Sequence, residues 1–500
     1  MITQDDVIYF VITDRFFNGD PTNDQPSEPA NPQHFHGGDF AGLVQKIPYF
    51  KTLGITAVWL TPVYVNIVDL NNSAGYHGYW AVDFERIDPH LYTARPDLAE
   101  GSRAYLAELV QTFHAAGLKV VLDMVVNHTG YHTPGYESNP NKFLRPEHFN
   151  DPQASSEVKG SLSGLPDLNH DLPEVADYFV QNILDWIEQT GIDGIRMDTV
   201  KHVEPMFWYL FKSLIRTRHP QVTLLGEVLN FDPDQVGPFQ QKHDFDTLFD
   251  FPMCGAIKGT LVWDRPMTDL VRPRLSPDEP RGILDREAPY TNANRLVTLL
   301  DNHDLDRRIT TEILDRVGHW DRDLARKILK MCVTFLFTTR GIPQIYYGTE
   351  IGLEGRKDPD NRRDMPWEMF DADNRPALDH AFERDIFDHT VRMIQVRHQN
   401  PAIRFGYLFT LYVDPFFYAY LREFQGDMVL VAINNGRDPM PLPATIEIGG
   451  NNTIPPRIKA LLKTNQILAS QIPDLADVTV TAGQVHVQLP GKTAAVWTLN

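Results

Sequence analysis

Cysteine and long apolar stretches are scarce in this sequence. Only two cysteines, Cys254 and Cys332, occur in 500 residues, too few for a disulfide framework or a cysteine-ligated zinc cluster. No apolar run approaches the roughly 18 residues that a membrane-spanning helix needs. The N-terminal stretch MITQDDVIYF has acidic residues where a signal peptide has a basic region and an apolar core. We therefore expect no membrane segment, and a cytoplasmic protein if Met1 is the native start or an extracellular one if a leader was removed.

Positive charge is also in short supply. The chain has 46 Lys and Arg against 66 Asp and Glu, a formal net charge of −20. Phosphate backbones and anionic membrane surfaces attract basic patches, so this balance disfavours nucleic acid and membrane partners and suits a neutral ligand. With 42% hydrophobic and 22% charged residues the composition is that of an ordinary globular protein, which we expect to be a monomer.

Short apolar runs alternate with helical patterns from residue 1 to about residue 400. Residues 103–116 place Leu106, Leu109 and Phe113 on one helical face, and residues 174–190 repeat the pattern before Gly191. Eight strands that alternate with helices predict a (β/α)8 barrel, in class α/β. The eight apolar runs are VIYFVI (7–12), ITAVWL (55–60), LKVVLDM (118–124), IDGIRM (192–197), VTLLGE (222–227), FDTLFDF (245–251), RLVTLL (295–300) and IPQIYY (342–347).

Two segments depart from this alternation. A connection of about 45 residues, rich in Pro, Gly, Asn and His, follows the third strand, and loops of that length usually carry function. After residue 403, short strands separated by turn signals such as NNGRD predict an antiparallel β-sandwich module. We predict a catalytic barrel at 1–127 and 173–402, an inserted subdomain at 128–172 and a C-terminal β-sandwich domain at 403–500.

Polar side chains gather at the carboxyl ends of the predicted strands, where barrels have their active sites. Any one of them has an ordinary interpretation, because an Asp after a strand is commonly a helix cap. Four carboxylates, an arginine and three histidines at one barrel mouth are much harder to explain as caps. The residues are Asp123, Asn127 and His128 (DMVVNH), Arg196 and Asp198 (GIRMDTVKH), Glu227 (LLGEV), His303 and Asp304 (LLDNHD), and His77 and Tyr79 (GYHGYW).

Two chemistries use several carboxylates at one barrel mouth. Glycosidic bond cleavage uses one carboxylic acid as general acid and a second carboxylate as nucleophile or base. The alternative is enolisation on a bound divalent metal, which needs a lysine or histidine base beside the metal. No strand-end lysine precedes Lys201, so the pattern favours cleavage of glycosidic bonds.

In this order, DMVVNH, GIRMDTVKH, GEV and LLDNHD resemble the four signature segments of the α-amylase family of retaining glycoside hydrolases. The stretches GLPDLN (164–169) and GIPQIYYGTEIGLEG (341–355) extend the resemblance to essentially the whole chain. It implies that Asp198 is the nucleophile, Glu227 the general acid/base and Asp304 the stabiliser of the transition state. Arg196 resembles the arginine that hydrogen-bonds the nucleophile, and a guanidinium there favours an ionised carboxylate.

The resemblance also implies residues that bind substrate. His128 and His303 match partners of the sugar at the cleavage point, and Tyr79, beside His77, matches a stacking platform. Two more pairs match positions further along the sugar chain: Asp358 and Arg362 on the non-reducing side, and Lys201 and His202 on the leaving-group side.

Calcium (Ca²⁺) is the ion that the resemblance implies. A first site would use Asn127, Asp167 and His202 with a backbone carbonyl near Val158, and such oxygen-rich ligands suit calcium. A second site is suggested by NGDPTND and GGD, although these residues are also ordinary turn formers. Its ligands would be Asn18, Asp20, Asn23, Asp24, the Gly37 carbonyl and Asp39.

The chain also departs from relatives in this family. Cyclodextrin-forming members have an aromatic four residues before the aspartate of DLNH, where this chain has Ser163, and this sequence contains a single β module. We therefore predict a retaining α-1,4-glucan hydrolase that acts on starch, maltooligosaccharides and cyclodextrins. The alternatives are a 4-α-glucanotransferase or cyclodextrin-active transglycosylase on the same scaffold and, more remotely, a non-catalytic carbohydrate-binding barrel.

Overall fold

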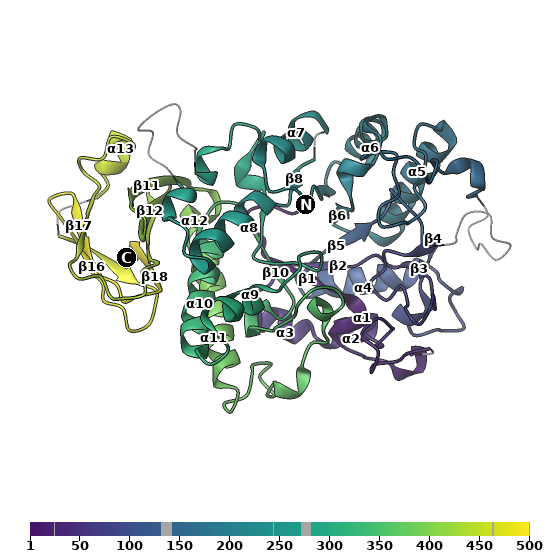
Figure 1. Ribbon diagram of the computed structural model, residues 1–500, viewed down its shortest axis with the longest axis horizontal. Coiled ribbons are helices and arrows are strands. Elements are labelled where there is room, and N and C mark those ends of the chain that lie inside the picture. Colours follow the sequence, from purple (N-terminus) through teal and green to yellow (C-terminus); the bar gives the residue numbers. More distant parts are fainter. Residues whose placement is uncertain (25, 132–142, 244, 272–281, 463–464, 500) are drawn as a thin grey trace. The chain divides into compact units, whose positions relative to one another are not determined.

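The protein is described by a computed structural model covering residues 1–24, 26–131, 143–243, 245–271, 282–462 and 465–499 (Figure 1). The chain divides into two compact units. The first contains residues 1–229, 236–249 and 357–374, and the second contains residues 230–235, 250–356 and 375–500. The fold class predicted from the sequence is confirmed: a (β/α)8 barrel and a C-terminal antiparallel β module. The predicted domain boundaries stay a prediction.

Six of the barrel strands belong to the first unit, where they pair in parallel in the order β8-β7-β6-β5-β2-β1. Their residues are buried on both faces, as expected for a parallel sheet covered by helices. The strands are β1 (Ile8–Val11), β2 (Ala57–Leu60), β5 (Lys119–Met124), β6 (Gly194–Met197), β7 (Thr223–Gly226) and β8 (Thr247–Leu248).

Two helices of the first unit lie where apolar stripes at 103–116 and 174–190 predict them. Helix α5 (Pro173–Thr190) starts with Pro at its first position and ends at Gly191, whose φ of 72° is the left-handed conformation that glycine adopts at low cost. The other helices of this unit are α1 (Thr13–Phe16), α2 (Phe40–Gln45), α3 (Ile47–Leu53), α4 (Ala104–Ala115), α6 (Pro205–Arg218) and α7 (Pro233–His243), which begins in the second unit.

A β-hairpin that the sequence pattern does not predict follows β2. Strands β3 (Tyr64–Asn66) and β4 (Ala81–Ile87) pair in antiparallel fashion with two register shifts. Asn66 holds the connection together, since its side chain donates to Tyr64 O at 2.7 Å and accepts from Trp80 N at 2.8 Å. The hairpin fixes the segment that contains His77, Tyr79 and Trp80.

The second unit contributes strands β9 (Val297–Thr298) and β10 (Ile342–Tyr346), which pair in parallel. The run 245–251 forms only a short strand because Asp250 caps the next helix, accepting from Met253 N at 3.1 Å. The helices of this unit are α8 (Phe251–Ile257), α9 (Ile309–Val317), α10 (Arg322–Thr338), α11 (Ala381–Gln399), α12 (Pro401–Phe405) and α13 (Pro456–Lys459).

The C-terminal module is one eight-stranded antiparallel sheet in the order β11-β12-β13-β18-β15-β16-β17-β14. Inward residues from these strands, including Leu421, Leu430, Ile446 and Trp497, share one hydrophobic core. The strands are β11 (Tyr407–Val413), β12 (Phe417–Phe424), β13 (Asp427–Asn434), β14 (Ala444–Glu447), β15 (Gln466–Ser470), β16 (Val478–Thr481), β17 (Gln484–Val487) and β18 (Thr493–Leu499).

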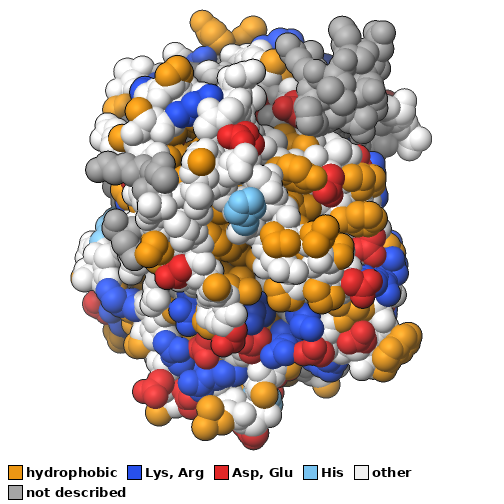
Figure 2. Space-filling view, turned by 90° about the vertical axis from the view of Figure 1, so that its left-hand side faces the viewer, with side chains coloured by type: hydrophobic (Ala, Val, Ile, Leu, Met, Phe, Trp, Pro, Cys, Tyr) orange, Lys and Arg blue, Asp and Glu red, His pale blue; other side chains and the backbone are white. Residues whose placement is uncertain are grey.

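Acidic and basic side chains are interleaved over the lower part of the face drawn in Figure 2. On α10 and α11, Lys330 and Arg326 both pair with Asp385, at 2.9 Å and 3.2 Å. Among the described residues, no helix is both long and apolar enough to cross a bilayer.

Candidate active site

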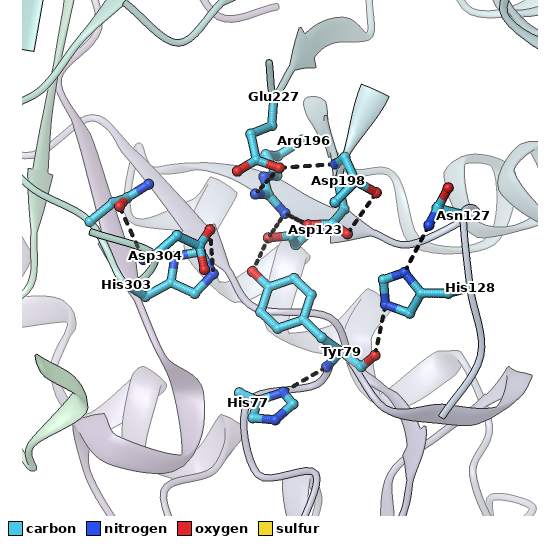
Figure 3. Close-up of polar contacts among 12 residues, drawn as sticks. His77, Tyr79, Asp123, Asn127, His128, Arg196, Asp198, Glu227, His303 and Asp304 are labelled. Atoms are coloured by element: carbon cyan, nitrogen blue, oxygen red, sulfur yellow. Dashed lines mark hydrogen bonds and ion pairs between the residues drawn. The ribbon is translucent and has the colours of Figure 1, made fainter. Parts of the chain in front are cut away.

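One buried arginine connects three carboxylates in the first unit (Figure 3). Arg196 Nη1 lies 2.8 Å from Asp123 Oδ1 and 2.7 Å from Asp198 Oδ1, and its Nη2 lies 3.0 Å from Glu227 Oε2. The side chains of Arg196 and Asp123 are 0% exposed, and those of Asp198 and Glu227 are 7% and 6% exposed. One guanidinium therefore contacts three carboxyl groups that are almost fully buried.

Strand register explains why these groups meet. In the parallel pairing, Asp123 on β5 lies opposite Arg196 on β6, and Arg196 lies opposite Leu225 on β7. Side chains two residues apart on a strand point to the same side, so Asp198 follows Arg196 and Glu227 follows Leu225 on that side. The sequence prediction that Arg196 and Asp198 are neighbours agrees with this geometry, and Glu227 joins them from the next strand.

Asp123 connects more residues of this cluster than the sequence pattern indicates. Its Oδ2 accepts hydrogen bonds from Tyr79 Oη at 2.7 Å and Trp59 Nε1 at 3.1 Å. Burial raises the pKa of Asp123 to about 8, against the opposing effect of the Arg196 charge. Asp123 thereby links the arginine to Tyr79, the predicted stacking residue. Its strand-end position in DMVVNH is the signal that could have assigned it.

Thr199 is a residue of this cluster that sequence reasoning missed. Its backbone N–H donates to Glu227 Oε2 at 2.9 Å, and its hydroxyl donates to Asp198 Oδ2 at 3.1 Å. Thr199 has a φ of 48°, a left-handed conformation that is uncommon for a β-branched residue. This turn directly after Asp198 gives both carboxylates a common partner, which fixes one relative to the other.

Histidine and tyrosine side chains adjoin the cluster. His128 Nε2 donates to Tyr79 O at 3.2 Å, and its Nδ1 accepts from Asn127 Nδ2 at 3.3 Å. Burial lowers the pKa of His128 to about 4, so its ring is neutral at pH 7. His77 Nδ1 accepts from Tyr79 N at 3.0 Å, and the rings of His77 and Tyr79 stack with centroids 5.7 Å apart.

The remaining predicted catalytic residue, Asp304, belongs to the second unit, as does its neighbour His303, a predicted substrate contact. His303 Nε2 lies 3.5 Å from Asp304 Oδ2, and Asn302 Oδ1 accepts from the backbone N–H groups of Asp304 and Leu305 at 3.1 Å each. The His303 side chain is 1% exposed and that of Asp304 is 29% exposed. The Asn302 turn therefore leaves the Asp304 carboxyl accessible to water while His303 is buried.

The four outlying substrate-binding candidates fall into two pairs, and all belong to the first unit. Arg362 Nη1 lies 3.3 Å from Asp358 Oδ1, so these two residues form an ion pair with each other. Lys201 pairs with Glu157 Oε1 at 3.1 Å, and His202 Nδ1 donates to Glu157 O at 2.8 Å. The carbonyl that contacts His202 thus belongs to Glu157, next to Val158.

The first predicted calcium site has features that fit a cation. Asn127 and Asp167 are buried on adjacent segments, since His128 forms a bridge with Asp167 and Leu168 N donates to Asn127 O at 2.9 Å. Burial and the charge of Glu204 raise the pKa of Asp167 to about 7. Within the described part of the chain, the two oxygens of Glu204, a 4% exposed residue, have no hydrogen-bond partner of good geometry. Carboxylate oxygens buried together in this way suit a positive ion.

The second predicted site assembles as well, but two of its residues also act as caps. Asp39 accepts from Gly42 N at 2.7 Å at the start of α2, and Asp20 accepts from Thr22 N at 3.0 Å. Asn18 Nδ2 donates to Asp24 Oδ2 at 2.8 Å, and Gly37 has a φ of 95° where a Cβ would lie 2.6 Å from Asp24 Oδ1.

Two oxygens of this second cluster, Asn23 Oδ1 and Asp24 Oδ1, are buried without a hydrogen-bond partner in the described chain. Among the described residues, no three His, Cys, Asp or Glu side chains group as a metal site. A cation in either place would therefore depend on amide and backbone oxygens, which calcium accepts.

Comparison with known proteins agrees with the family resemblance found in the sequence. A family profile described as "Alpha amylase, catalytic domain" matches residues 10–159 and 149–402. The chain is 34% identical over 444 residues to Beta/alpha-amylase from Paenibacillus polymyxa, a match that covers 86% of this chain and 33% of that protein. It thus spans about a third of that relative's length.

Two solved structures align over nearly the whole chain. An Anoxybacillus α-amylase has a TM-score of 0.81 and 31% identity, with 100% of this chain and 98% of that chain covered. A cyclomaltodextrin glucanotransferase described as having a three-domain ABC distribution has a TM-score of 0.76 and 29% identity, with 99% of both chains covered. Since the catalytic-domain profile alone spans well over half of the sequence, this chain belongs to the α-amylase family of glycoside hydrolases and transglycosylases.

Proposed function

We propose that the chain is a retaining α-1,4-glucan hydrolase that cleaves starch, maltooligosaccharides and cyclodextrins through a covalent glycosyl intermediate on Asp198. The observation that carries this proposal is the Arg196 cluster, in which one guanidinium contacts Asp123, Asp198 and Glu227. A retaining glycosidase needs two carboxyl groups close together in different protonation states. A cluster with more carboxylates than positive charges can supply both states.

In the first step, Glu227 transfers its proton to the glycosidic oxygen as the bond between that oxygen and the anomeric carbon breaks. An oxygen of Asp198 forms the new bond to the anomeric carbon, and the leaving sugar departs with the proton. In the second step Glu227 removes a proton from water, whose oxygen attacks the anomeric carbon and releases Asp198. Asp304 is assigned the stabilisation of positive charge that develops on the sugar ring.

Arg196 and Thr199 have positioning roles in this scheme. Arg196 contacts Oδ1 of Asp198 at 2.7 Å and Thr199 contacts Oδ2 at 3.1 Å, so the carboxylate is held at both oxygens. Such restraint keeps the nucleophile in a reactive orientation, which is a large part of what an enzyme site contributes. Thr199 N also contacts Glu227 Oε2 at 2.9 Å, so movement of this turn would displace both groups together.

Calcium belongs to the proposal as a structural ion. Asn127, Asp167 and the segment at His202 would hold one ion, and Asn18, Asp20, Asn23, Asp24, Gly37 and Asp39 would hold another. When bound, the ion neutralises buried carboxylates and connects segments that are distant in sequence. Glu204 is close enough to Asp167 to raise its pKa, which supports a cation at the first site.

Proton NMR during hydrolysis of maltoheptaose tests the mechanism. We expect the new reducing ends to appear first as α-anomers, because two inversions at the anomeric carbon give retention. The proposal also predicts Asp198 and Glu227 carboxyl groups roughly 5–5.5 Å apart in a substrate complex. Initial release of β-anomers would refute the assignment of Asp198 as nucleophile.

The rival function is transglycosylation, in which a sugar replaces water in the second step. The alignment with the cyclomaltodextrin glucanotransferase structure covers 99% of both chains. Domain content therefore does not distinguish hydrolysis from transglycosylation. We still propose that hydrolysis dominates, because Ser163 and Gly164 occupy the segment in which cyclodextrin-forming relatives have an aromatic side chain. The assay is concentrated soluble starch, scored for cyclic products against reducing ends, and cyclodextrins as the main early product would contradict the proposal.

A further inference from the structure

One tryptophan of the second unit is almost fully exposed to solvent. Trp320 lies in the turn between α9 and α10, and it is 87% exposed. Hydrogen bonds fix this turn at both ends: Gly318 N donates to Leu314 O at 2.8 Å, and Asp321 N donates to Gly318 O at 3.1 Å. Asp321 also caps α10, because its side chain accepts from Leu324 N at 3.1 Å. The indole is therefore presented to water by an ordered turn.

The indole ring lies face-on against the backbone of Gly318. A Cβ added to Gly318 would lie 2.3 Å from Cη2, 2.3 Å from Cζ3 and 2.6 Å from Cε3 of Trp320. Three consecutive ring atoms are that close to one point only if the point lies above the plane of the ring. Gly318, whose φ is 95°, leaves room for this contact because it has no side chain. The chain thus supports one face of the indole, and the opposite face is open to solvent.

Charged side chains around this turn are paired with one another. The side chain of His319 is 55% exposed and lies 3.8 Å from Asp315 Oδ1 and 4.0 Å from Glu354 Oε2. Arg322 Nη1 lies 3.3 Å from Glu354 Oε1, and Arg356 Nη2 lies 2.7 Å from Asp315 Oδ1. Polar groups of both signs therefore adjoin the turn, and neither sign dominates. Such a surface suits the hydroxyl groups of a neutral ligand better than a charged partner.

We propose that Trp320 binds an α-glucan chain at the protein surface, as a second contact for the polymer apart from the point of cleavage. This inference rests on the proposed function, in which the substrate is a glucan polymer. A pyranose ring has apolar C–H faces and a polar rim, so it fits the open face of the indole while the paired side chains meet its hydroxyls.

Helix α9 separates this contact from the turn that holds Asp304. The helix begins at Ile309, after that turn, and its nine residues span about 14 Å before the chain reaches Trp320. A polymer held at two separate places dissociates more slowly than one held at either place alone, because the second contact forms within the complex. Loss of Trp320 should therefore weaken binding of polymeric glucan and leave short substrates unaffected.

Adsorption to granular starch measures the surface contact without catalysis. Each variant is made in an Asp198→Asn background, so that the granules are not digested, and free protein is measured over a range of starch concentrations. For Trp320→Ala we expect the affinity to fall about tenfold, a change equivalent to about 1.4 kcal/mol. Trp320→Tyr keeps an aromatic ring and should recover most of the affinity, which a folding defect would not allow.

Tyr209→Ala is the matched control for the loss of an exposed ring. Tyr209 lies on α6 in the first unit and is 68% exposed. Its replacement should change adsorption by no more than about twofold, as for an ordinary surface position. An equal loss in Tyr209→Ala and Trp320→Ala would mean that any exposed ring adsorbs to starch, and it would overturn the inference.

Kinetics on a short substrate show whether Trp320 belongs to the cleavage site. With Asp198 intact, kcat/KM of Trp320→Ala for maltotetraose should stay within about twofold of the wild type. A tenfold fall there would place Trp320 in the cleavage site, and unchanged adsorption of Trp320→Ala would remove the surface contact; either result overturns the inference. If the wild type adsorbs through Trp320 but cleaves no α-glucan, the proposed hydrolase function fails and the surface contact stands.

Discussion

Each of the two units contains a buried arginine, and the two guanidinium groups have different partners. In the first, Arg196 contacts three carboxylates and its site carries excess negative charge. In the second, Arg422 is 1% exposed and donates to two backbone carbonyls, Thr338 O at 3.2 Å and Gly406 O at 2.8 Å. Among the described residues no carboxylate lies within ion-pair distance of Arg422, and burial lowers its pKa to about 10.

This difference separates the proposed reactive site from a structural one. Arg422 satisfies carbonyl groups at the end of α10 and before β11, and a side chain that only satisfies hydrogen bonds contributes to stability. Around Arg196 the charges do not balance, and burial raises the pKa of Asp123 to about 8. Unbalanced buried charge is costly, and it persists where chemistry requires carboxyl groups in different protonation states.

The largest effect should come from the cluster itself. Asp198→Asn removes the proposed nucleophile while keeping the shape of the side chain, so we expect kcat for maltoheptaose to fall on the order of 10⁴–10⁶-fold. The matched control is Asp388→Asn, a residue that pairs with Arg375 at 2.6 Å on α11 and should keep wild-type kcat. Residual activity above about one per cent in Asp198→Asn would assign the nucleophile elsewhere.

A second variant tests the structural arginine. Arg422→Met leaves two buried carbonyls without their donor, which should lower the free energy of unfolding by about 2–4 kcal/mol. Below the unfolding transition, kcat should match the wild type. Urea denaturation followed by circular dichroism measures the stability. A loss of kcat without a loss of stability would make Arg422 part of the catalytic machinery and remove the contrast between the two arginines.

Calcium removal should affect the first unit in particular. If an ion binds Asn127 and Asp167, it stabilises the folded state by mass action, by about 2.7 kcal/mol at a free concentration 100 times its Kd. We expect the melting temperature to fall with a strong chelator and to recover with added calcium. Glu204→Gln should weaken this calcium dependence. An unchanged melting curve, with metal analysis showing no bound ion, would exclude calcium.

A smaller, pH-dependent effect is expected from the second unit. Burial lowers the pKa of His389 from 6.5 to about 3, with Lys330 and Arg392 acting in the same direction and Asp385 opposing them. The unfolded chain therefore binds more protons than the folded one between about pH 6.5 and 3, so stability falls as pH drops through this window. At pH 5 the contribution is about 2 kcal/mol relative to pH 7.

His389→Gln should reduce this loss, because the substituted side chain does not titrate. The measurement is the free energy of unfolding of both proteins in urea at pH 7 and at pH 5. An equal change between the two pH values in both proteins would show that His389 does not titrate on unfolding as expected.

Local patterns in the sequence identify the barrel and most of its polar strand ends. Alternation of apolar runs and helical stripes depends on residues that are close in sequence, so β1, β2, β5, β6, β7 and β10 and helices α4 and α5 lie where the pattern predicts them. Asp198, Glu227 and Asp304 stand out for the same reason, since each lies at the end of such a run or within four residues after it.

Only tertiary structure decides which distant groups meet. The contacts of Arg196 with Asp123 and Glu227, of Thr199 with Glu227 and of Tyr131 with Ser163 join segments 28–73 residues apart, and no local periodicity encodes them. The hairpin β3–β4 and the shortness of β8 also depend on side chains such as Asn66 and Asp250 that find backbone partners after folding. Burial then sets the protonation of these groups, because desolvation acts on a carboxyl only once the surrounding chain has excluded water.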